Sequence, residues 1–395
     1  GGIALQYNFD EIIDRRNTDS LKYDFAKERE KPEEILPLWV ADMDFKTPAC
    51  VIDALVDKSQ HGIFGYSETK RDYFEVLQHW FSSRFHWKIQ PEWLVKTPGV
   101  VYAISTAIRA LTAKGDAVLV QQPVYYPFSR SVLVNQRKLA VNQLIYSQGK
   151  YRIDFEDLEE KVIKNHVKLF ILCSPHNPVG RVWTREELIR LGDICLKHGV
   201  IVISDEIHAD FTYQGYRHLV FADVKPEFSK IAVTCTAPSK TFNLAGLQIS
   251  NIFIASGDIR SKFRQEIARS GYSQMNTMGI AACRAAYAKG GEWLAQLKEY
   301  LAGNLNFLSG FLQEKLPSIR LVEPEGTYLA WLDCSGLGLD SQKLEDLIVN
   351  RAQLWLDSGT MFGAGGEGFQ RVNIACPRII LQQALIQLED AVKSL

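Results

Sequence analysis

Short apolar segments that alternate with amphipathic helices are the feature that most constrains the fold of this chain. In these segments apolar residues follow one another without alternating polar positions, so both faces of each strand should be buried. Helices between such strands form right-handed crossovers, which join parallel strands. The sequence therefore predicts an α/β fold with a mainly parallel sheet sandwiched by helices; its strands are expected at residues 117–121, 168–173, 200–204 and 231–236, and its helices at 102–114, 155–165 and 184–198.

The two ends of the chain differ from its middle and predict a second domain. Residues 1–48 are mostly irregular in pattern. After about residue 290 we expect a long helix, a strand pair near 319–322 and 327–333, and helices over 341–351 and 379–394. The prediction is a large domain over residues 49–290 and a smaller α+β domain built from 1–48 and 291–395, with the ligand between them.

Composition limits the partners of this 395-residue chain. A net charge of −1 gives no reason to expect nucleic acid or an anionic membrane surface. No apolar run has the length of a membrane span, and residues 1–7 lack the pattern of a signal peptide. The seven cysteines are widely spaced and include no Cys-x-x-Cys, which predicts buried, reduced thiols in a cytoplasmic protein.

Three polar side chains follow three of the predicted strands, namely Asn177, Asp205 and Lys240. Open α/β sheets bind their ligands at the carboxyl ends of the strands. The trio matches what pyridoxal phosphate (PLP) requires: a lysine to bond its aldehyde, an aspartate to keep its ring nitrogen protonated, and an asparagine to hydrogen-bond its phenolic oxygen. Lys240 alone would be interpreted as a surface residue, but the ordered combination indicates a cofactor site.

The same region offers groups for the phosphate and for the ring face. Residues 97–101 precede a predicted helix, where Gly99 allows a tight turn and the amides of Val100 and Val101 can face a phosphate. One tyrosine of the pair Tyr125 and Tyr126 could stack on the ring, although paired tyrosines also occur as simple packing.

Three further features leave alternatives open. His208 could help to hold the phenolic oxygen or could be an ordinary core or surface histidine. Arg371 could present its planar fork to a substrate carboxylate or form a surface salt bridge. The Gly-x-Gly-x-x-Gly of residues 363–368 precedes an expected strand rather than a helix, so we interpret it as a flexible loop beside the site and not as a dinucleotide fingerprint. No residues have the spacing of a metal site.

Taken together, these motifs resemble those of fold-type I PLP enzymes of the class I/II aminotransferase superfamily. Within it the chain is similar to the MalY/PatB branch of cystathionine β-lyases, the C–S lyases that include cystalysin. The likeness runs nearly end to end and is carried by residues 39–45 (WVADMDF), 64–66, 97–101, 123–128, 174–180 (SPHNPVG), 205–208 (DEIH) and 237–243 (APSKTFN).

The resemblance implies a role for each candidate residue. Lys240 would carry the cofactor and act in catalysis together with Tyr126, which lies near the substrate. Tyr66 would reach the phosphate in the neighbouring subunit of a homodimer. The remaining cofactor contacts would be Asp205, Asn177, Tyr125, His208, Val100, Val101 and Ser239, and the remaining substrate contacts Arg371 and Ala41.

Two departures from the wider superfamily favour the lyase branch. Many aminotransferases have an arginine at the position of Gln248 and a tyrosine at that of His208. The predicted reaction is therefore β-elimination from L-cystathionine or a related S-substituted L-cysteine, which yields a thiol, pyruvate and ammonia. The alternatives are a PLP-dependent aminotransferase and, with less support, a PLP-binding regulatory protein.

Overall fold

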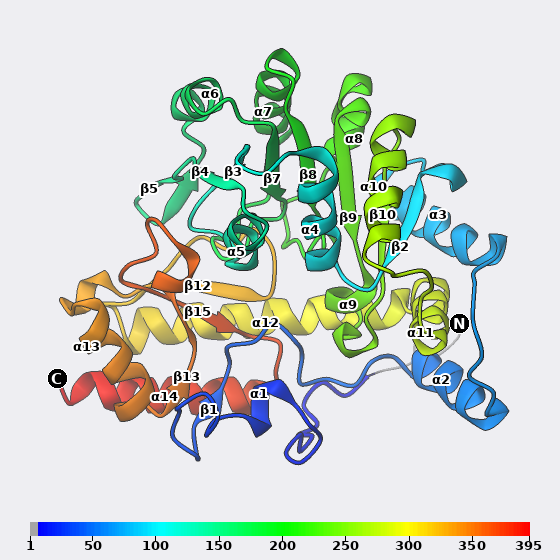
Figure 1. The fold of residues 1–395 in the computed structure, drawn as a ribbon. Helices are drawn as coiled ribbons and strands as arrows, with labels where there is room; N and C mark the ends of the chain where they lie inside the picture. The colour runs from blue at the N-terminus through cyan, green and yellow to red at the C-terminus, as the bar shows by residue number, and fades with distance from the viewer. Residues whose placement is uncertain (1–6) are drawn as a thin grey trace.

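A seven-stranded sheet forms the core of the upper part of the molecule in Figure 1. The computed structural model describes residues 7–395, so most of the segment on which the signal-peptide expectation depends lies outside it. From β4 to β9 every neighbouring pair is parallel, and only β10 runs against its neighbours, which confirms the predicted mainly parallel sheet. The strand order is β2 (Leu94–Thr97), β10 (Ser250–Phe253), β9 (Ala232–Thr236), β8 (Ile201–Asp205), β7 (Leu169–Cys173), β3 (Ala117–Val120) and β4 (Lys138–Val141).

Helices cover both faces of this sheet, as the continuous apolar strands predict. On β7, Leu169 and Ile171 pack into one cluster with α4 (Val100–Leu111), α5 (Pro127–Val134) and α10 (Gly257–Arg269). Phe170 and Leu172 pack into another with α6 (Phe155–Lys164), α7 (Arg185–Lys197) and α8 (Phe221–Val224). Each fully buried side chain of this size contributes about 1.5–3 kcal/mol, so the strands that end at the site belong to the most stable part of the molecule.

Local capping signals fix the starts of the crossover helices. Asp154 accepts a hydrogen bond from the Asp157 amide at the start of α6 (3.1 Å). Thr184 and Glu187 form the capping box of α7. In contrast, α4 begins at Val100 and ends at Leu111, whereas the sequence predicted 102–114. The helix therefore starts directly after Gly99 and places Val100 and Val101 in its first turn.

A second, antiparallel sheet lies beyond the carboxyl ends of the large sheet's strands. It consists of β11 (Arg320–Leu321), β12 (Leu329–Asp333), β15 (Phe369–Asn373) and β14 (Asp357–Ser358), and it confirms the predicted strand pair. Figure 1 shows the long helix α12 (Gly291–Lys315) and the final helix α14 (Arg378–Lys393) running across this end of the molecule. The helix expected over 341–351 is α13 (Ser341–Asp346) followed by a π-helical turn. The domain limits at residues 49 and 290 stay a prediction.

The N-terminal segment also lies at this end (Figure 1). Its short strand β1 (Leu36–Pro37) pairs with β13 (Leu354–Trp355) and leads into residues 39–45, which we call the strap. The remaining elements are α1 (Leu21–Asp24), α2 (Ala49–His61), α3 (Arg71–Phe85), β5 (Ile145–Ser147), β6 (Lys150–Arg152), α9 (Pro238–Thr241) and α11 (Thr277–Lys289).

None of the helices within residues 7–395 is both long and apolar enough to cross a bilayer. All seven cysteines are free and six are buried, in agreement with the predicted thiols.

Candidate active site

The carboxyl ends of β7, β8 and β9 bring Asn177, Asp205 and Lys240 together. Register pairs Cys173 with Asp205 and Asp205 with Cys235, so the three strands end side by side, and α9 follows β9 directly. The three side chains line one pocket with a cavity volume of about 210 Å³. The same pocket is lined by Ala41, Val100, Val101, Tyr125, His208, Ser239 and Gln248. Nearly all residues predicted for the cofactor therefore meet in one place, as do the positions of both departures from the superfamily.

Burial in this pocket shifts the pKa values of Asp205 and Lys240 in opposite directions, and in both residues it disfavours the charged form. Burial raises the pKa of Asp205 to about 7, although the amide of Ile207 (3.2 Å) and the charge of Lys240 act in the other direction. Burial and the nearby Arg371 lower the pKa of Lys240 to about 8. A carboxylate in this position has too little positive charge around it, which a protonated ring nitrogen would supply. A lysine with this pKa is a free amine in a useful fraction of molecules near neutral pH.

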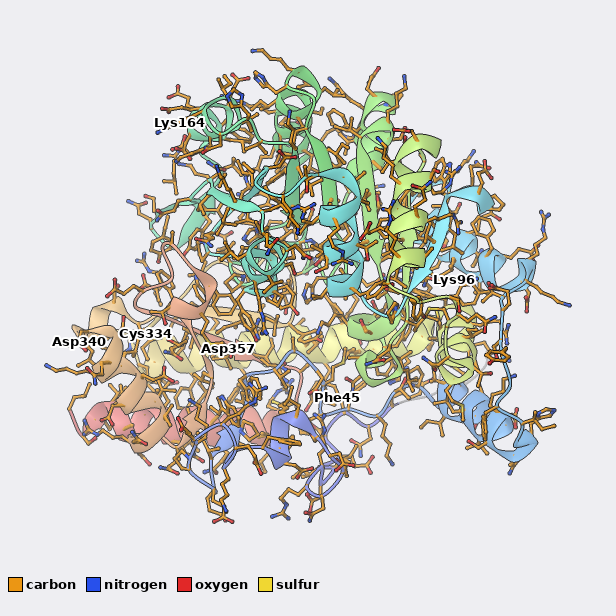
Figure 2. All side chains as sticks on the ribbon, in the orientation of Figure 1. Phe45, Lys96, Lys164, Cys334, Asp340 and Asp357 are labelled. Carbon is orange, nitrogen blue, oxygen red and sulfur yellow. The ribbon has the colours of Figure 1, made fainter. Side chains whose placement is uncertain are left out.

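Arg371 is held by three segments that are distant in the sequence. Its Nη2 donates to Asp357 Oδ2 (2.7 Å) and to the carbonyl of Trp39 (2.6 Å), and its Nη1 donates to Asn177 Oδ1 (3.2 Å). Figure 2 shows Asp357 below the large sheet and above α14. Arg371 is only 2% exposed, so the alternative of a surface salt bridge does not fit. Its Nε has no acceptor among the described residues, which leaves one buried donor for a ligand.

His208 is buried and neutral. Burial, Lys240 and Arg371 lower its pKa to about 3, and its Nδ1 has no hydrogen-bond partner within residues 7–395. An unpaired ring nitrogen beside Asn177 and Lys240 is free to bond a ligand oxygen. Tyr125 also lines the pocket, and burial raises the pKa of its hydroxyl. Tyr126 does not line this pocket; it packs on Phe362 beside it, with ring centroids 5.7 Å apart.

The opposite end of the pocket suits a phosphate. The first-turn amides of α4 belong to Val100 and Val101, and a helix N-terminus attracts anions. A Cβ added to Gly99 would meet nothing within 4 Å, so protein packing does not require a glycine there, whereas a bound group would use that space. Together with the unpaired His208 nitrogen and the undercompensated Asp205, this shows that the residues present fit PLP.

Within the strap, the sequence predicted only Ala41 as a site residue. The carbonyl of Ala41 accepts hydrogen bonds from Lys240 Nζ (3.0 Å) and from the Tyr328 hydroxyl (2.9 Å). Two asparagines hold the rest of the strap: Asn243 bonds Met43 N, Met43 O and Phe45 O, and Asn373 bonds Val40 O and Asp42 O. Sequence reasoning missed Asn243, Asn373 and Tyr328. The only available signal was the position of both asparagines just after a candidate residue, Lys240 or Arg371.

One predicted cofactor residue does not reach the pocket of its own chain. Tyr66 lies in an irregular segment and is 98% exposed, beside the exposed Ile63 and Phe64. The glycine loop of residues 363–368 has positive φ at Gly363, Gly365 and Gly368 and leads into β15, so it does not open a helix, as expected.

Comparisons with known proteins agree with this geometry. The sequence model of the family described as "Aminotransferase class I and II" matches residues 33–385. "Cystathionine beta-lyase PatB" of Bacillus subtilis is 44% identical over 97% of this chain and 99% of its own length. "Protein MalY" of Escherichia coli is 32% identical over 98% of this chain and 99% of its own length. The crystal structure of cystalysin from Treponema denticola, which contains pyridoxal 5'-phosphate, superposes with a TM-score of 0.94 at 38% identity and covers 99% of this chain and 100% of that one. The chain therefore belongs to the aminotransferase class I and II family, in the branch that holds PatB and MalY.

Proposed function

We propose that this protein is a PLP-dependent C–S lyase of the cystathionine β-lyase type. Its substrates are L-cystathionine or related S-substituted L-cysteines, and its products are a thiol, pyruvate and ammonia. The observation that carries this proposal is the single pocket in which Lys240 and Asp205 face Asn177, in a chain 44% identical to a protein named cystathionine β-lyase.

Each pocket residue has its own contact with PLP. When bound, PLP supplies an aldehyde for the substrate amine and a ring that withdraws the electron pair released at Cα. Asp205 would keep the ring nitrogen protonated, and Asn177 and His208 would form hydrogen bonds with the phenolic oxygen. Tyr125 covers the ring face. Val100, Val101 and Ser239 receive the phosphate.

Lys240 and Arg371 then act on the substrate. Arg371 holds the α-carboxylate with its charged guanidinium, whose Nε is the donor left without a protein partner among the described residues. Lys240, with its pKa lowered to about 8, removes the proton from Cα as a free amine. The C–S bond breaks at Cβ, and the departing sulfur takes a proton from Lys240 or from the Tyr126 hydroxyl. The remaining 2-aminoacrylate leaves the site and reacts with water, which gives pyruvate and ammonia. The Ala41 carbonyl accepts a hydrogen bond from Lys240 Nζ at 3.0 Å, so it can hold the side chain of Lys240 when that side chain is not bonded to the cofactor.

The proposal includes a homodimer in the cytoplasm. The nearly complete exposure of Tyr66, next to exposed Ile63 and Phe64, supports a segment that is covered by a second copy of the chain. In that arrangement Tyr66 contacts the phosphate of the partner's site. The buried free thiols support a reducing compartment.

Product analysis with the purified, PLP-loaded protein tests the function. Incubation with L-cystathionine should release equal amounts of pyruvate, ammonia and homocysteine, and Lys240→Ala should release none. Borohydride reduction followed by peptide mass spectrometry should find the cofactor mass on Lys240 of the wild type. Conversion of the cofactor to its pyridoxamine form without pyruvate would favour the aminotransferase alternative. PLP binding without turnover of any S-substituted cysteine would favour the regulatory one.

A further inference from the structure

Two tryptophans and two cations form a stack at the edge of the candidate active site. The rings of Trp39 and Trp355 are nearly parallel (10°), with centroids 4.3 Å apart, and both residues are buried. The Arg29 guanidinium lies 5.1 Å from the Trp39 ring centroid, and the Lys31 ammonium lies 5.8 Å from that of Trp355. Such cation–π contacts hold a long, otherwise mobile side chain over a rigid platform.

This platform is connected directly to the predicted substrate groups. The Trp39 carbonyl accepts from Arg371 Nη2 (2.6 Å), and the Arg371 guanidinium lies 5.2 Å from the Phe362 ring centroid. Phe362 in turn packs on Tyr126. Burial and the Asp357 carboxylate raise the pKa of Tyr126, whereas Arg371 and Arg29 oppose that increase. Arg29 is therefore close enough for its charge to act on the substrate side of the site.

The described acidic groups around this platform form no direct ion pair with Arg29. Arg371 is paired with Asp357 (2.7 Å), and Lys31 lies 3.9 Å from Glu345. The Arg29 side chain is exposed, and its guanidinium makes no hydrogen bond or ion pair with any residue in the described part of the chain, residues 7–395. Its planar fork of donors faces solvent from a fixed platform, an arrangement suited to a carboxylate.

We infer that Arg29 recognises a carboxylate on the leaving-group half of the substrate. The preferred substrates would then carry two carboxylates, the α-carboxylate at Arg371 and a second one, beyond the sulfur, at Arg29. This inference rests on the proposed lyase function and narrows its substrate class to cysteines whose S-substituent ends in a carboxylate. Arg29 determines specificity and touches none of the reacting atoms.

A matched pair of substrates tests this inference in the PLP-loaded enzyme. S-(2-carboxyethyl)-L-cysteine and S-propyl-L-cysteine are similar in length and differ mainly in the terminal charge, so the ratio of their kcat/KM values isolates recognition of the carboxylate. Pyruvate release gives both values. We expect Arg29→Gln to lower this ratio about fivefold, in line with an exposed ion pair, and Arg29→Lys to retain part of it. Because the contact is exposed, 0.5 M salt should reduce the preference of the wild type as well.

Controls separate a specific role from general damage. Lys27→Gln removes an exposed cation two residues away and should leave the ratio unchanged. Turnover of S-propyl-L-cysteine by Arg29→Gln should stay within twofold of wild type, which shows that the variant is folded and active. An equal loss with both substrates, or no change with either, would overturn the role of Arg29 while leaving the lyase function intact. Absence of pyruvate from both substrates with the wild type would overturn the lyase function itself.

Discussion

Replacing Asp205 with asparagine should stabilise the cofactor-free protein while it abolishes turnover. Asp205 is 5% exposed, and burial raises its pKa to about 7, against an unperturbed value near 4. At neutral pH and above, the folded, empty protein must therefore keep a poorly compensated carboxylate out of water. Asparagine has nearly the same volume, carries no charge, and can still accept the hydrogen bond from the Ile207 amide.

The expected size and sign of this effect follow from proton binding. Between about pH 4 and pH 7 the folded wild type binds more protons at Asp205 than the unfolded chain does, so its stability falls as the pH rises through this window. A shift of about three pKa units at roughly 1.4 kcal/mol each gives a cost of about 4 kcal/mol once the carboxyl is ionised in both states. Asp205→Asn does not have this cost because asparagine carries no charge. Its advantage should be about 2 kcal/mol at pH 5 and about 4 kcal/mol at pH 8.5.

Urea denaturation of cofactor-stripped wild type and Asp205→Asn, at equal protein concentrations and at both pH values, measures this difference. Asp258→Asn is a suitable control because that carboxylate is 78% exposed and should change stability little at either pH. The loaded variant should also lose turnover, since asparagine cannot hold the proton on the ring nitrogen. A variant no more stable than wild type at pH 8.5, or a gain that does not shrink at pH 5, would refute the reasoning.

Two further perturbations probe the arginine and the strap. Arg371→Leu should cost about 3–5 kcal/mol in urea denaturation because Asp357 is left buried without its cation, and Arg371→Leu/Asp357→Leu should recover most of this loss. A double variant as unstable as the single one would contradict that explanation. Asn243→Ala should cost about 2–3 kcal/mol because it removes three hydrogen bonds to the strap and puts alanine in a left-handed backbone conformation (φ 59°), and Asn243→Gly, which loses the same hydrogen bonds without the backbone strain, should cost less. Equal losses in the two Asn243 variants would show that the backbone conformation at this position contributes nothing.

The central parallel strands could be predicted from the sequence, whereas β10, the strand next to the edge strand β2, could not. β7 is apolar at all five positions, a pattern that a buried parallel strand produces. β10 begins with Ser250 and Asn251, yet all four of its residues are buried. Its polar side chains are paired with distant partners, as in the hydrogen bond from the Tyr73 hydroxyl to Asn251 Oδ1 (2.5 Å). A polar residue that is satisfied 178 positions away leaves no local signal.

The candidate site also contains some residues that the sequence predicts and others that it does not. Asn177, Asp205 and Lys240 could be placed because each directly follows a recognisable strand, so sheet topology alone brings them together. Tyr328 and Asn373 contact the strap across 287 or more residues, and only the packing of the second sheet against the N-terminal segment creates those contacts. Local sequence contains no information about which backbone carbonyl a side chain will meet at that range.

Arg371 shows what this long-range packing adds to the chemistry. The sequence leaves a surface ion pair and a carboxylate receptor equally open, and the structure removes the surface ion pair by burying the guanidinium among Asp357, Trp39 and Asn177. Because Asn177 is also the predicted partner of the cofactor's phenolic oxygen, the proposed substrate receptor and a proposed cofactor ligand share one hydrogen bond (3.2 Å). A change at either residue must then alter both sites, so variants of Arg371 should show altered PLP affinity as well as a higher KM.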